Sequence, residues 1–174
     1  MNKQRLKFLI IAAVVIVFGV ALDQYSKWLC VQHLPYETPV ECIPHILNLT
    51  YITNDGAAWG MLDEHRWVFM SISTVAIIGM LIFLFTLKEK SETFLAVSLA
   101  VIISGGIGNM IDRVMLETVV DFIDFNPFLS YLHLSFPIFN IADTLVCIGG
   151  GMLVLAYILL WKKEEQEKKE KKAE

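Results

Sequence analysis

The sequence predicts a mainly α membrane protein with four transmembrane helices, a small extracytoplasmic β-sheet and a short interfacial helix. Apolar residues make up 56% of the 174-residue chain and charged residues only 18%. The mean hydropathy of +0.59 also lies above that of a typical soluble domain. Four apolar runs can each cross a bilayer core of roughly 30 Å, which takes about 20 helical residues. No internal repeat accompanies them, so the repeated halves of many transporters are not indicated.

The four apolar runs predict helices over about 6–29, 67–87, 94–111 and 138–161. Three basic residues (Lys3, Arg5 and Lys7) precede the apolar core of the first run, as in a signal peptide, but the run is too long and no small-residue cleavage site follows it. We therefore expect a retained helix. Residues 1–161 are expected to form a single membrane domain, and residues 162–174 a charged tail that is either helical or disordered.

The distribution of basic residues predicts the orientation in the membrane. Of 14 basic residues, three lie at or before the start of the first run (Lys3, Arg5 and Lys7), two lie between the second and third runs, and six follow Trp161. Basic residues concentrate in cytoplasmic segments. The pattern therefore places both termini in the cytoplasm, and loops 30–66 and 112–137 outside.

The outer loops contain signals of local structure. Residues 46–53 are rich in β-branched and aromatic residues and end in the turn sequence Asn-Asp-Gly. Residues 114–122 and 131–139 show similar patterns, so we expect a small sheet over the membrane. Ala57–Leu62, which contains Trp59, is expected to form the interfacial helix, since tryptophan favours headgroup depth.

Polar residues are expected to gather in one layer near the outer surface. At 1.5 Å per residue, Asp23 lies about 22 Å from Phe8 along the first helix, and Asp143 reaches a similar level in the fourth. Asn109 stands near the outer end of the third, and Asn140 lies close to Asp143 in sequence. Burying a carboxylate in hydrocarbon costs at least about 2.5–3.5 kcal/mol. A buried polar cluster is therefore expected.

Several kinds of site are not indicated. The four histidines lack metal-ligand spacing and the three cysteines form no Cys-x-x-Cys, so we predict no metal or cofactor. Whether Cys30 pairs with Cys42 is left open. The stretch GGIGNMI (105–111) lacks the third glycine of a nucleotide loop. Its small residues, like Gly149–Gly151, are expected to allow close helix packing. No nucleic-acid partner is predicted.

The buried carboxylates suggest a pair that shares one proton. Two aspartates a few ångströms apart cannot both ionise cheaply, so one pKa falls and the other rises. Such a pair can hold a water molecule, activate it as a general base and protonate a leaving amine. Asp143 is the natural first member. The second could be Asp121, Asp124, Asp112 or Asp23, and these arguments do not choose among them.

Five motifs resemble those of the lipoprotein signal peptidase (signal peptidase II) family of bacterial intramembrane aspartyl proteases. They are DQYSK (23–27), NDGAAWG (54–60), GGIGNMIDR (105–113), VVDF (119–122) and FNIAD (139–143), in the family's order. The resemblance implies Asp121 and Asp143 as the catalytic pair and gives Asp124 no role. It implies supporting or substrate-binding roles for Asp23, Lys27, Asn54, Gly108, Asn109, Arg113, Asn140 and Ala142.

The resemblance also implies a substrate and a location. The substrate would be a prolipoprotein in the bacterial cytoplasmic membrane, cut just before a diacylglyceryl-modified cysteine, with membrane lipid around the site. Inhibition by the cyclic peptide globomycin is implied as well.

A small proton-coupled transporter is the main alternative, because intramembrane carboxylates often relay protons. Transporter sites usually lie near the midplane of repeated halves, whereas these residues are expected near one face. A structural membrane subunit is a second alternative.

Overall fold

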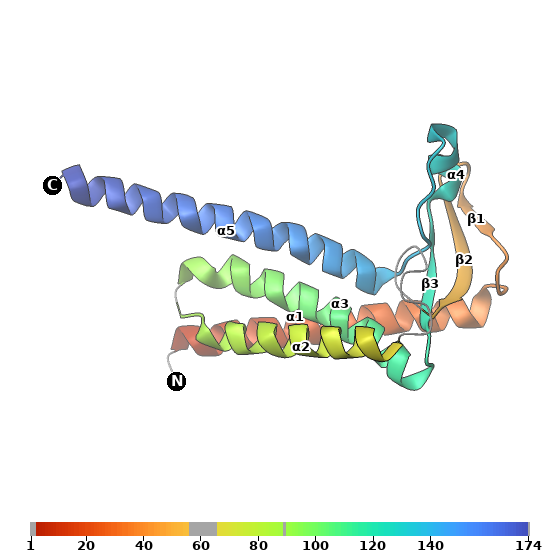
Figure 1. The fold of residues 1–174 in the computed structure, drawn as a ribbon, viewed down its shortest axis with the longest axis horizontal. Helices are drawn as coiled ribbons and strands as arrows, with labels where there is room; N and C mark the ends of the chain where they lie inside the picture. Colours follow the sequence, from red (N-terminus) through yellow and green to blue (C-terminus); the bar gives the residue numbers. More distant parts are fainter. Residues whose placement is uncertain (1–2, 56–65, 89, 174) are drawn as a thin grey trace.

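The computed structural model describes residues 3–55, 66–88 and 90–173. Long helices run side by side, and a small sheet lies across one end of them (Figure 1). The long helices are α1 (Lys3–His33), α2 (Arg66–Thr86), α3 (Thr93–Met115) and α5 (Ile141–Ala173). Within the described residues, these four are long and apolar enough to cross a membrane. The predicted fold class, four membrane helices with a small sheet, is confirmed.

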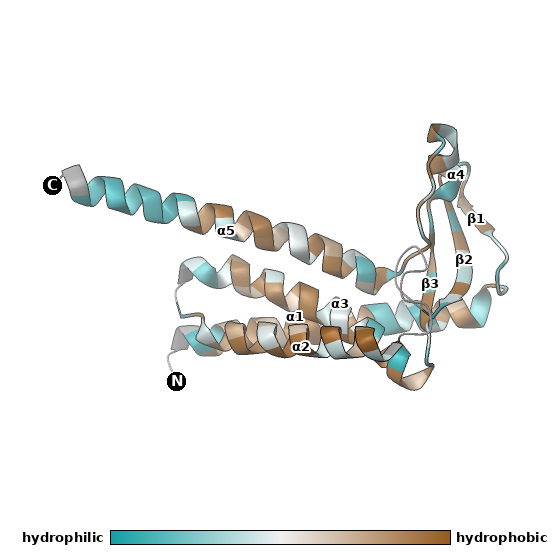
Figure 2. Ribbon diagram, in the orientation of Figure 1, coloured by the Kyte–Doolittle hydropathy of each residue, from teal (hydrophilic) through white to brown (hydrophobic). Residues whose placement is uncertain are grey.

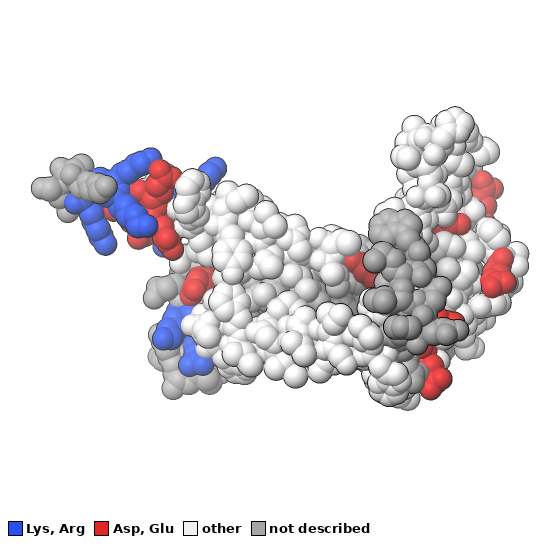
Figure 3. Space-filling view, in the orientation of Figure 1, with Lys and Arg blue, Asp and Glu red and all other residues white. Residues whose placement is uncertain are grey.

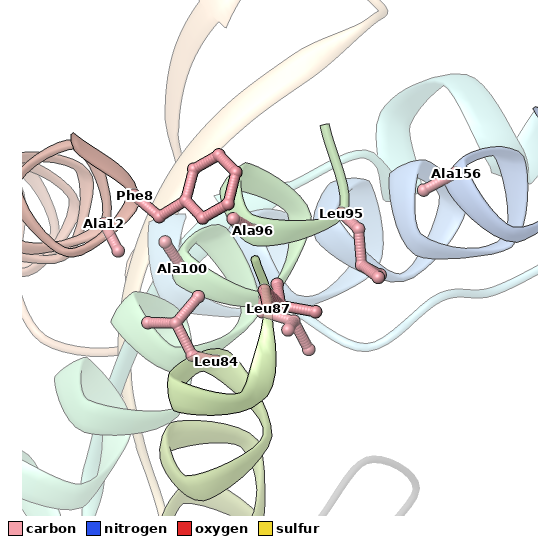
Figure 4. Close-up of a cluster of buried hydrophobic side chains, with 9 residues drawn as sticks. Phe8, Ala12, Leu84, Leu87, Leu95, Ala96, Ala100 and Ala156 are labelled. Carbon is pink, nitrogen blue, oxygen red and sulfur yellow. The ribbon is translucent and has the colours of Figure 1, made fainter. Parts of the chain in front are cut away.

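Helix α3 occupies the centre and contacts α1, α2 and α5. A hydrophobic cluster joins all four helices at the end away from the sheet (Figure 4). Its labelled members are Phe8 and Ala12 from α1, Leu84 and Leu87 at the end of α2, Leu95, Ala96 and Ala100 from α3, and Ala156 from α5. Alanines here let the helix backbones approach closely, which is how membrane helices gain packing energy.

The outer surfaces of the helices are strongly apolar. Val17, Phe18, Val75 and Val154 are each more than 60% exposed, and Figure 2 shows brown residues along most of each helix. Exposed apolar surface of this extent marks an interaction surface, and a lipid bilayer fits helices of this length. Teal residues gather on the last turns of α5 (Figure 2).

The sheet has three antiparallel strands in the order β1 (Val40–Ile43), β2 (Leu47–Asn54) and β3 (Val119–Asp124). Strands β2 and β3 agree with the patterns at 46–53 and at the end of 114–122. Strand β1 was not predicted. In the register of β2 and β3, Ile52 pairs with Asp121 and Asn54 with Val119.

The predicted strand at 131–139 is wrong. After the short helix α4 (Asn126–Leu129), a 3-10 turn, η3 (Ser130–Leu132), ends at His133, whose φ of 54° is left-handed. Only Phe139 then pairs with β3, through a single bridge to Ile123. Pro137 has no backbone N–H to donate, which disfavours a continuous ladder over this stretch.

Several helix boundaries also differ from expectation. Helix α1 extends from Lys3 to His33 rather than from 6 to 29, and α3 continues to Met115 rather than ending at 111. Helix α5 begins at Ile141 rather than 138 and continues to Ala173, so the charged tail is helical. Two ion pairs at i,i+4 spacing, Lys163–Glu167 and Glu165–Lys169, favour this extension. A further short 3-10 turn, η2 (Lys90–Glu92), precedes α3. The predicted interfacial helix Ala57–Leu62 lies outside the described residues.

Both chain ends lie at the same end of the helices, opposite the sheet (Figure 1). On the face shown in Figure 3, lysine and arginine side chains gather at that end, whereas the charged side chains visible at the sheet end are acidic. The visible basic side chains therefore concentrate at the end that carries the termini, beside the glutamates of the α5 tail, whereas acidic side chains appear at both ends.

Candidate active site

Asn140 and Asp143 cap the first turn of α5. The Asn140 side-chain oxygen accepts a hydrogen bond from the Asp143 amide at 2.9 Å, and the Asp143 carboxylate accepts one from the Asn140 amide at 3.2 Å. This reciprocal arrangement is a capping box, in which the N-cap residue and the residue three positions later satisfy each other's backbone donors. The spacing of the Asn-x-x-Asp motif is therefore explained by the start of the helix, which sets the direction of both side chains.

Asp121 lies in the middle of β3 and is 2% exposed. One carboxylate oxygen accepts a hydrogen bond from the Asn54 side chain at 2.9 Å, and the other accepts one from the Asn140 side chain at 2.7 Å. Asn54 can reach it because Asn54 is diagonally opposite Asp121 on neighbouring strands, within the range of a long side chain. The strand and the start of α5 thus meet at this carboxylate.

Asn140 joins Asp121 to Asp143. Its side-chain nitrogen donates to Asp121, while its backbone amide donates to Asp143. The second Asp143 oxygen accepts a hydrogen bond from Asn109 of α3 at 2.7 Å. We call Asp121 and Asp143 the aspartate pair. The structure brings them together from two elements and gives every carboxylate oxygen of the pair an amide donor.

Both aspartates line one cavity of about 550 Å³. This size is typical of a pocket for a small ligand or part of a peptide. Phe136, Pro137 and Ile138 form an apolar wall beside the pair, and Val146 and Ile148 of α5 extend this wall to the exposed helix surface. Polar chemistry is thus confined to one part of a mostly hydrophobic cavity.

Burial raises the pKa of the Asp121 carboxyl to about 7, and the charge of Asp143 raises it as well. Hydrogen bonds from Asn54 and Asn140 and the charge of Lys27 act in the opposite direction. The carboxyl therefore holds a proton well above the usual pH range of an aspartate. A proton-holding carboxyl beside a second carboxylate is the arrangement that shared-proton chemistry requires.

The other predicted polar residues meet behind the pair, which confirms the expected cluster from three helices. Lys27 of α1 contacts Asp23, Asp112 and Asn109. Sequence reasoning assigned no role to Gln24, whose side-chain nitrogen lies 2.8 Å from Asp112 and 3.2 Å from Asp23. The signal for it was a polar side chain beside Asp23 within an apolar run.

Arg113 lines the cavity from the last turn of α3. Its guanidinium donates to the Asn109 carbonyl at 3.3 Å and lies 5.6 Å from the centre of the Phe69 ring. A cation at this distance from an aromatic face is held by the ring. Arg113 thereby brings a positive charge to the cavity that the aspartate pair also lines.

Small residues allow this close assembly. A Cβ on Gly108 would lie 2.5 Å from an Asp23 oxygen, and a Cβ on Gly105 would overlap the Ala142 carbonyl oxygen. Gly149 similarly admits Ile102 of α3. The packing role predicted for Gly149–Gly151 holds only at Gly149, because a Cβ added at Gly150 or Gly151 would meet no atom of the described residues within 4 Å.

Asp124 is buried but belongs to a different set of contacts. It accepts hydrogen bonds from the Thr50 hydroxyl at 3.1 Å and from the backbone and side chain of Asn126. It does not line the cavity that holds the pair. Asp124 therefore fastens β2 and the start of α4, and it is separate from the candidate site. Cys30, which is buried, and Cys42, which is exposed, are not paired.

Fold and site together define a multi-pass membrane protein with a pair of carboxyls in an apolar cavity. The model of the family described as Signal peptidase (SPase) II matches residues 10–159, and the chain therefore belongs to the signal peptidase II family. Membership supports a lipoprotein signal peptidase role and confirms the resemblance drawn from the five motifs.

Two solved structures are similar to this chain. One, described as a bacterial membrane enzyme structure by the in meso method at 2.3 Å resolution, is 34% identical with a TM-score of 0.74, and the match covers 84% of this chain and 87% of the other. A second with the same description, at 1.9 Å resolution, is also 34% identical with a TM-score of 0.72, and the match covers 84% and 91%.

Proposed function

We propose that the chain is an aspartic endopeptidase that removes the signal peptide from diacylglyceryl-modified prolipoproteins, with Asp121 and Asp143 as its catalytic residues. The observation that carries the proposal is the meeting of these two carboxyls, from β3 and α5, in one cavity and on one bridging asparagine. Membership of the family provides the reaction class.

In the proposed mechanism the pair shares one proton and holds a water molecule between its oxygens. The raised pKa of Asp121 favours that carboxyl as the holder of the proton near neutral pH. The ionised partner, Asp143, takes a proton from the water as the water oxygen attacks the scissile carbonyl. The amine leaves with a proton from the pair, so the pair ends with the one proton it started with.

The apolar wall supports a lipid-linked substrate. The cavity extends from the pair along Val146 and Ile148, which are exposed on α5. A diacylglyceryl group is as apolar as the bilayer core, so it can reach this wall without leaving the membrane. Asn54 and Arg113 would contact peptide carbonyls or headgroup oxygens. Asp23, Lys27, Gly108, Asn109 and Ala142 would support the site from behind.

The same proposal extends to the placement of the chain. Residues 1–161 would form the peptidase domain and residues 162–174 a cytoplasmic tail, with both termini in the cytoplasm of a bacterial cell. The site would then lie near the outer face of the cytoplasmic membrane. Globomycin would inhibit the enzyme by occupying the cavity.

Substitution of single aspartates tests the mechanism. Asp121→Asn and Asp143→Asn should each lower cleavage of a lipidated precursor by at least about 100-fold, because an amide cannot exchange the shared proton. Asp124→Asn is the matched control, since Asp124 is a buried aspartate of the same strand with contacts outside the cavity. It should keep most activity and lose some thermal stability.

The assay uses purified protein in detergent with no energy source, and thermal melting controls for folding. Cleavage under these conditions also separates a peptidase from a proton-coupled transporter or a structural subunit. Normal cleavage by Asp143→Asn would overturn the aspartic mechanism. A dead Asp124→Asn beside an active Asp121→Asn would mean that the pair is wrongly assigned.

A further inference from the structure

Lys27 lies at the centre of a buried group of charges behind the aspartate pair. Its ammonium is 2.9 Å from a carboxylate oxygen of Asp23, 2.9 Å from one of Asp112 and 2.9 Å from the side-chain oxygen of Asn109. Lys27 and Asp112 are 3% and 2% exposed, and Asp23 is fully buried. One turn of α1 and one turn of α3 thus meet at this cation.

Each of the two carboxylates also accepts a hydrogen bond from the backbone of the site. Asp23 accepts one from the Ala142 amide at 2.9 Å, and Asp112 accepts one from the Val120 amide at 3.2 Å. Ala142 directly precedes Asp143 in the chain, and Val120 directly precedes Asp121. One cation therefore holds two anions, and each anion holds the backbone immediately before one member of the pair.

The third contact of Lys27 acts on Asp143 itself. An ammonium can only donate, so the Asn109 atom facing Lys27 must be the side-chain oxygen. The Asn109 nitrogen is then directed to Asp143, to which it donates at 2.7 Å. Gln24 strengthens the group, because its side-chain nitrogen contacts both carboxylates.

We propose that Lys27, Asp23 and Asp112 form a positioning triad that sets the separation and orientation of Asp121 and Asp143. The triad does not touch the substrate. It acts through two backbone amides and through Asn109. The inference rests on the proposed function, since it assigns a role relative to the aspartate pair.

Stability alone does not require that both carboxylates of this ion cluster accept hydrogen bonds from the residues directly before Asp121 and Asp143, as they do here. Buried ion pairs are also weak sources of stability, because the loss of hydration offsets most of the attraction. Precise geometry has a large effect on rate, since a displacement of about 1 Å at a reacting group can cost about 100-fold. The contacts of the triad therefore fit positioning better than stabilisation.

A charge-conserving double variant, Lys27→Met with Asp112→Asn, tests the triad. The cluster has one cation and two anions, and the variant leaves one anion, so the net charge stays the same. The asparagine oxygen can still accept from the Val120 amide, and methionine fills most of the lysine volume. We expect kcat to fall by about 100-fold, with KM close to that of the wild type, in protein that a cooperative melting transition shows to be folded.

The matched control is Lys163→Met with Glu167→Gln, which removes an exposed ion pair of the tail. It should leave kcat and KM unchanged. Asp112→Asn alone is the second test should the double variant fail to fold, and it should lower kcat with little change in KM.

A double variant, or a folded Asp112→Asn, with wild-type kcat would overturn the triad. This outcome differs from failure of the proposed function. If Asp121→Asn and Asp143→Asn are inactive while the triad variants cleave normally, only the triad is refuted. If either aspartate variant cleaves normally, the proposed catalytic pair itself is refuted.

Discussion

Asn140 shows how one side chain can serve the fold and the site together. Its oxygen caps α5, and its nitrogen lies within 3.2 Å of oxygens of Asp121, Asn109 and the Val120 backbone. It is fully buried, so no water competes for these bonds. A serine or threonine could cap the helix equally well, but neither carries a nitrogen that could donate to Asp121. The contact with the pair therefore explains asparagine at this position.

The raised pKa of Asp121 predicts a pH-dependent cost to folding. Its pKa is about 7 in the folded protein and close to 3.8 when exposed. The folded state thus binds this proton more tightly than the unfolded state does. The contribution of this proton to the free energy of unfolding is therefore complete below about pH 4 and is lost as pH rises through 7. Asp121→Asn removes the titration. Its stability relative to wild type should therefore increase between pH 5 and pH 8.

Thermal or denaturant unfolding of both proteins at these two pH values measures the effect. Between pH 5 and pH 8, the free energy of unfolding of Asp121→Asn should rise by a few kcal/mol relative to that of the wild type, since each unit of pKa corresponds to about 1.4 kcal/mol. Parallel curves for the two proteins across this range would contradict the raised pKa of Asp121.

At the scale of elements, the contact between α3 and α5 determines the position of the pair. Gly105→Ala would place a methyl group against the Ala142 carbonyl and 2.9 Å from a Val146 side-chain carbon, next to Asp143. We expect a loss of about 1–3 kcal/mol in stability, as for other overpacked positions, together with a loss of cleavage, because α5 must move.

Gly150→Ala is the matched control on α5. In the described part of the chain, an added Cβ there has no neighbour within 4 Å, and alanine favours helix by up to about 1 kcal/mol over glycine. Melting temperature and cleavage rate of the two variants measure the difference. Equal behaviour of Gly105→Ala and Gly150→Ala would show that the helices do not pack at Gly105.

The sequence was sufficient for the four long helices and for strands β2 and β3, and insufficient for strand β1 and for residues 131–139. Apolar runs of about 20 residues have few alternatives to a membrane helix, and all four were predicted. Strand β1 has only four residues, all exposed, so it leaves no alternation to detect. Residues 131–139 have the composition of a strand but pair with β3 only at Phe139. Pairing depends on a partner that local composition does not specify.

The same limit applies to the candidate site. Depth along each helix correctly placed Asp23, Asn109 and Asp143 together, because an uncompensated polar group in a membrane needs a partner. The choice of Asp121 over Asp124 came from the family motif alone. The positions of Gln24 and Asp112 depend on contacts between residues 88 apart in the chain, and no local pattern encodes them.

At the scale of the whole molecule, charge and fold indicate the same orientation. Both termini lie at the end of the helices where lysine and arginine gather, and the sheet with the nearby aspartate pair lies at the other end (Figures 1 and 3). Basic residues resist transfer across the membrane and remain in the cytoplasm. The substrate cysteine of the proposed reaction lies near the outer headgroups, so the sheet end should face outward.

Reporter fusions test this orientation. A reporter that is active only outside the cytoplasm should be silent when fused after Leu87 or Trp161 and active when fused near His45 or Pro127. A second reporter that is active only in the cytoplasm should give the reverse pattern at the same four positions, which controls for expression. The two positions expected in the cytoplasm lie beside the basic segments, and the two expected outside lie in the turn between β1 and β2 and in α4. An external signal after Trp161 would put the aspartate pair at the cytoplasmic face, where a peptidase acting on exported lipoproteins could not meet its cleavage site.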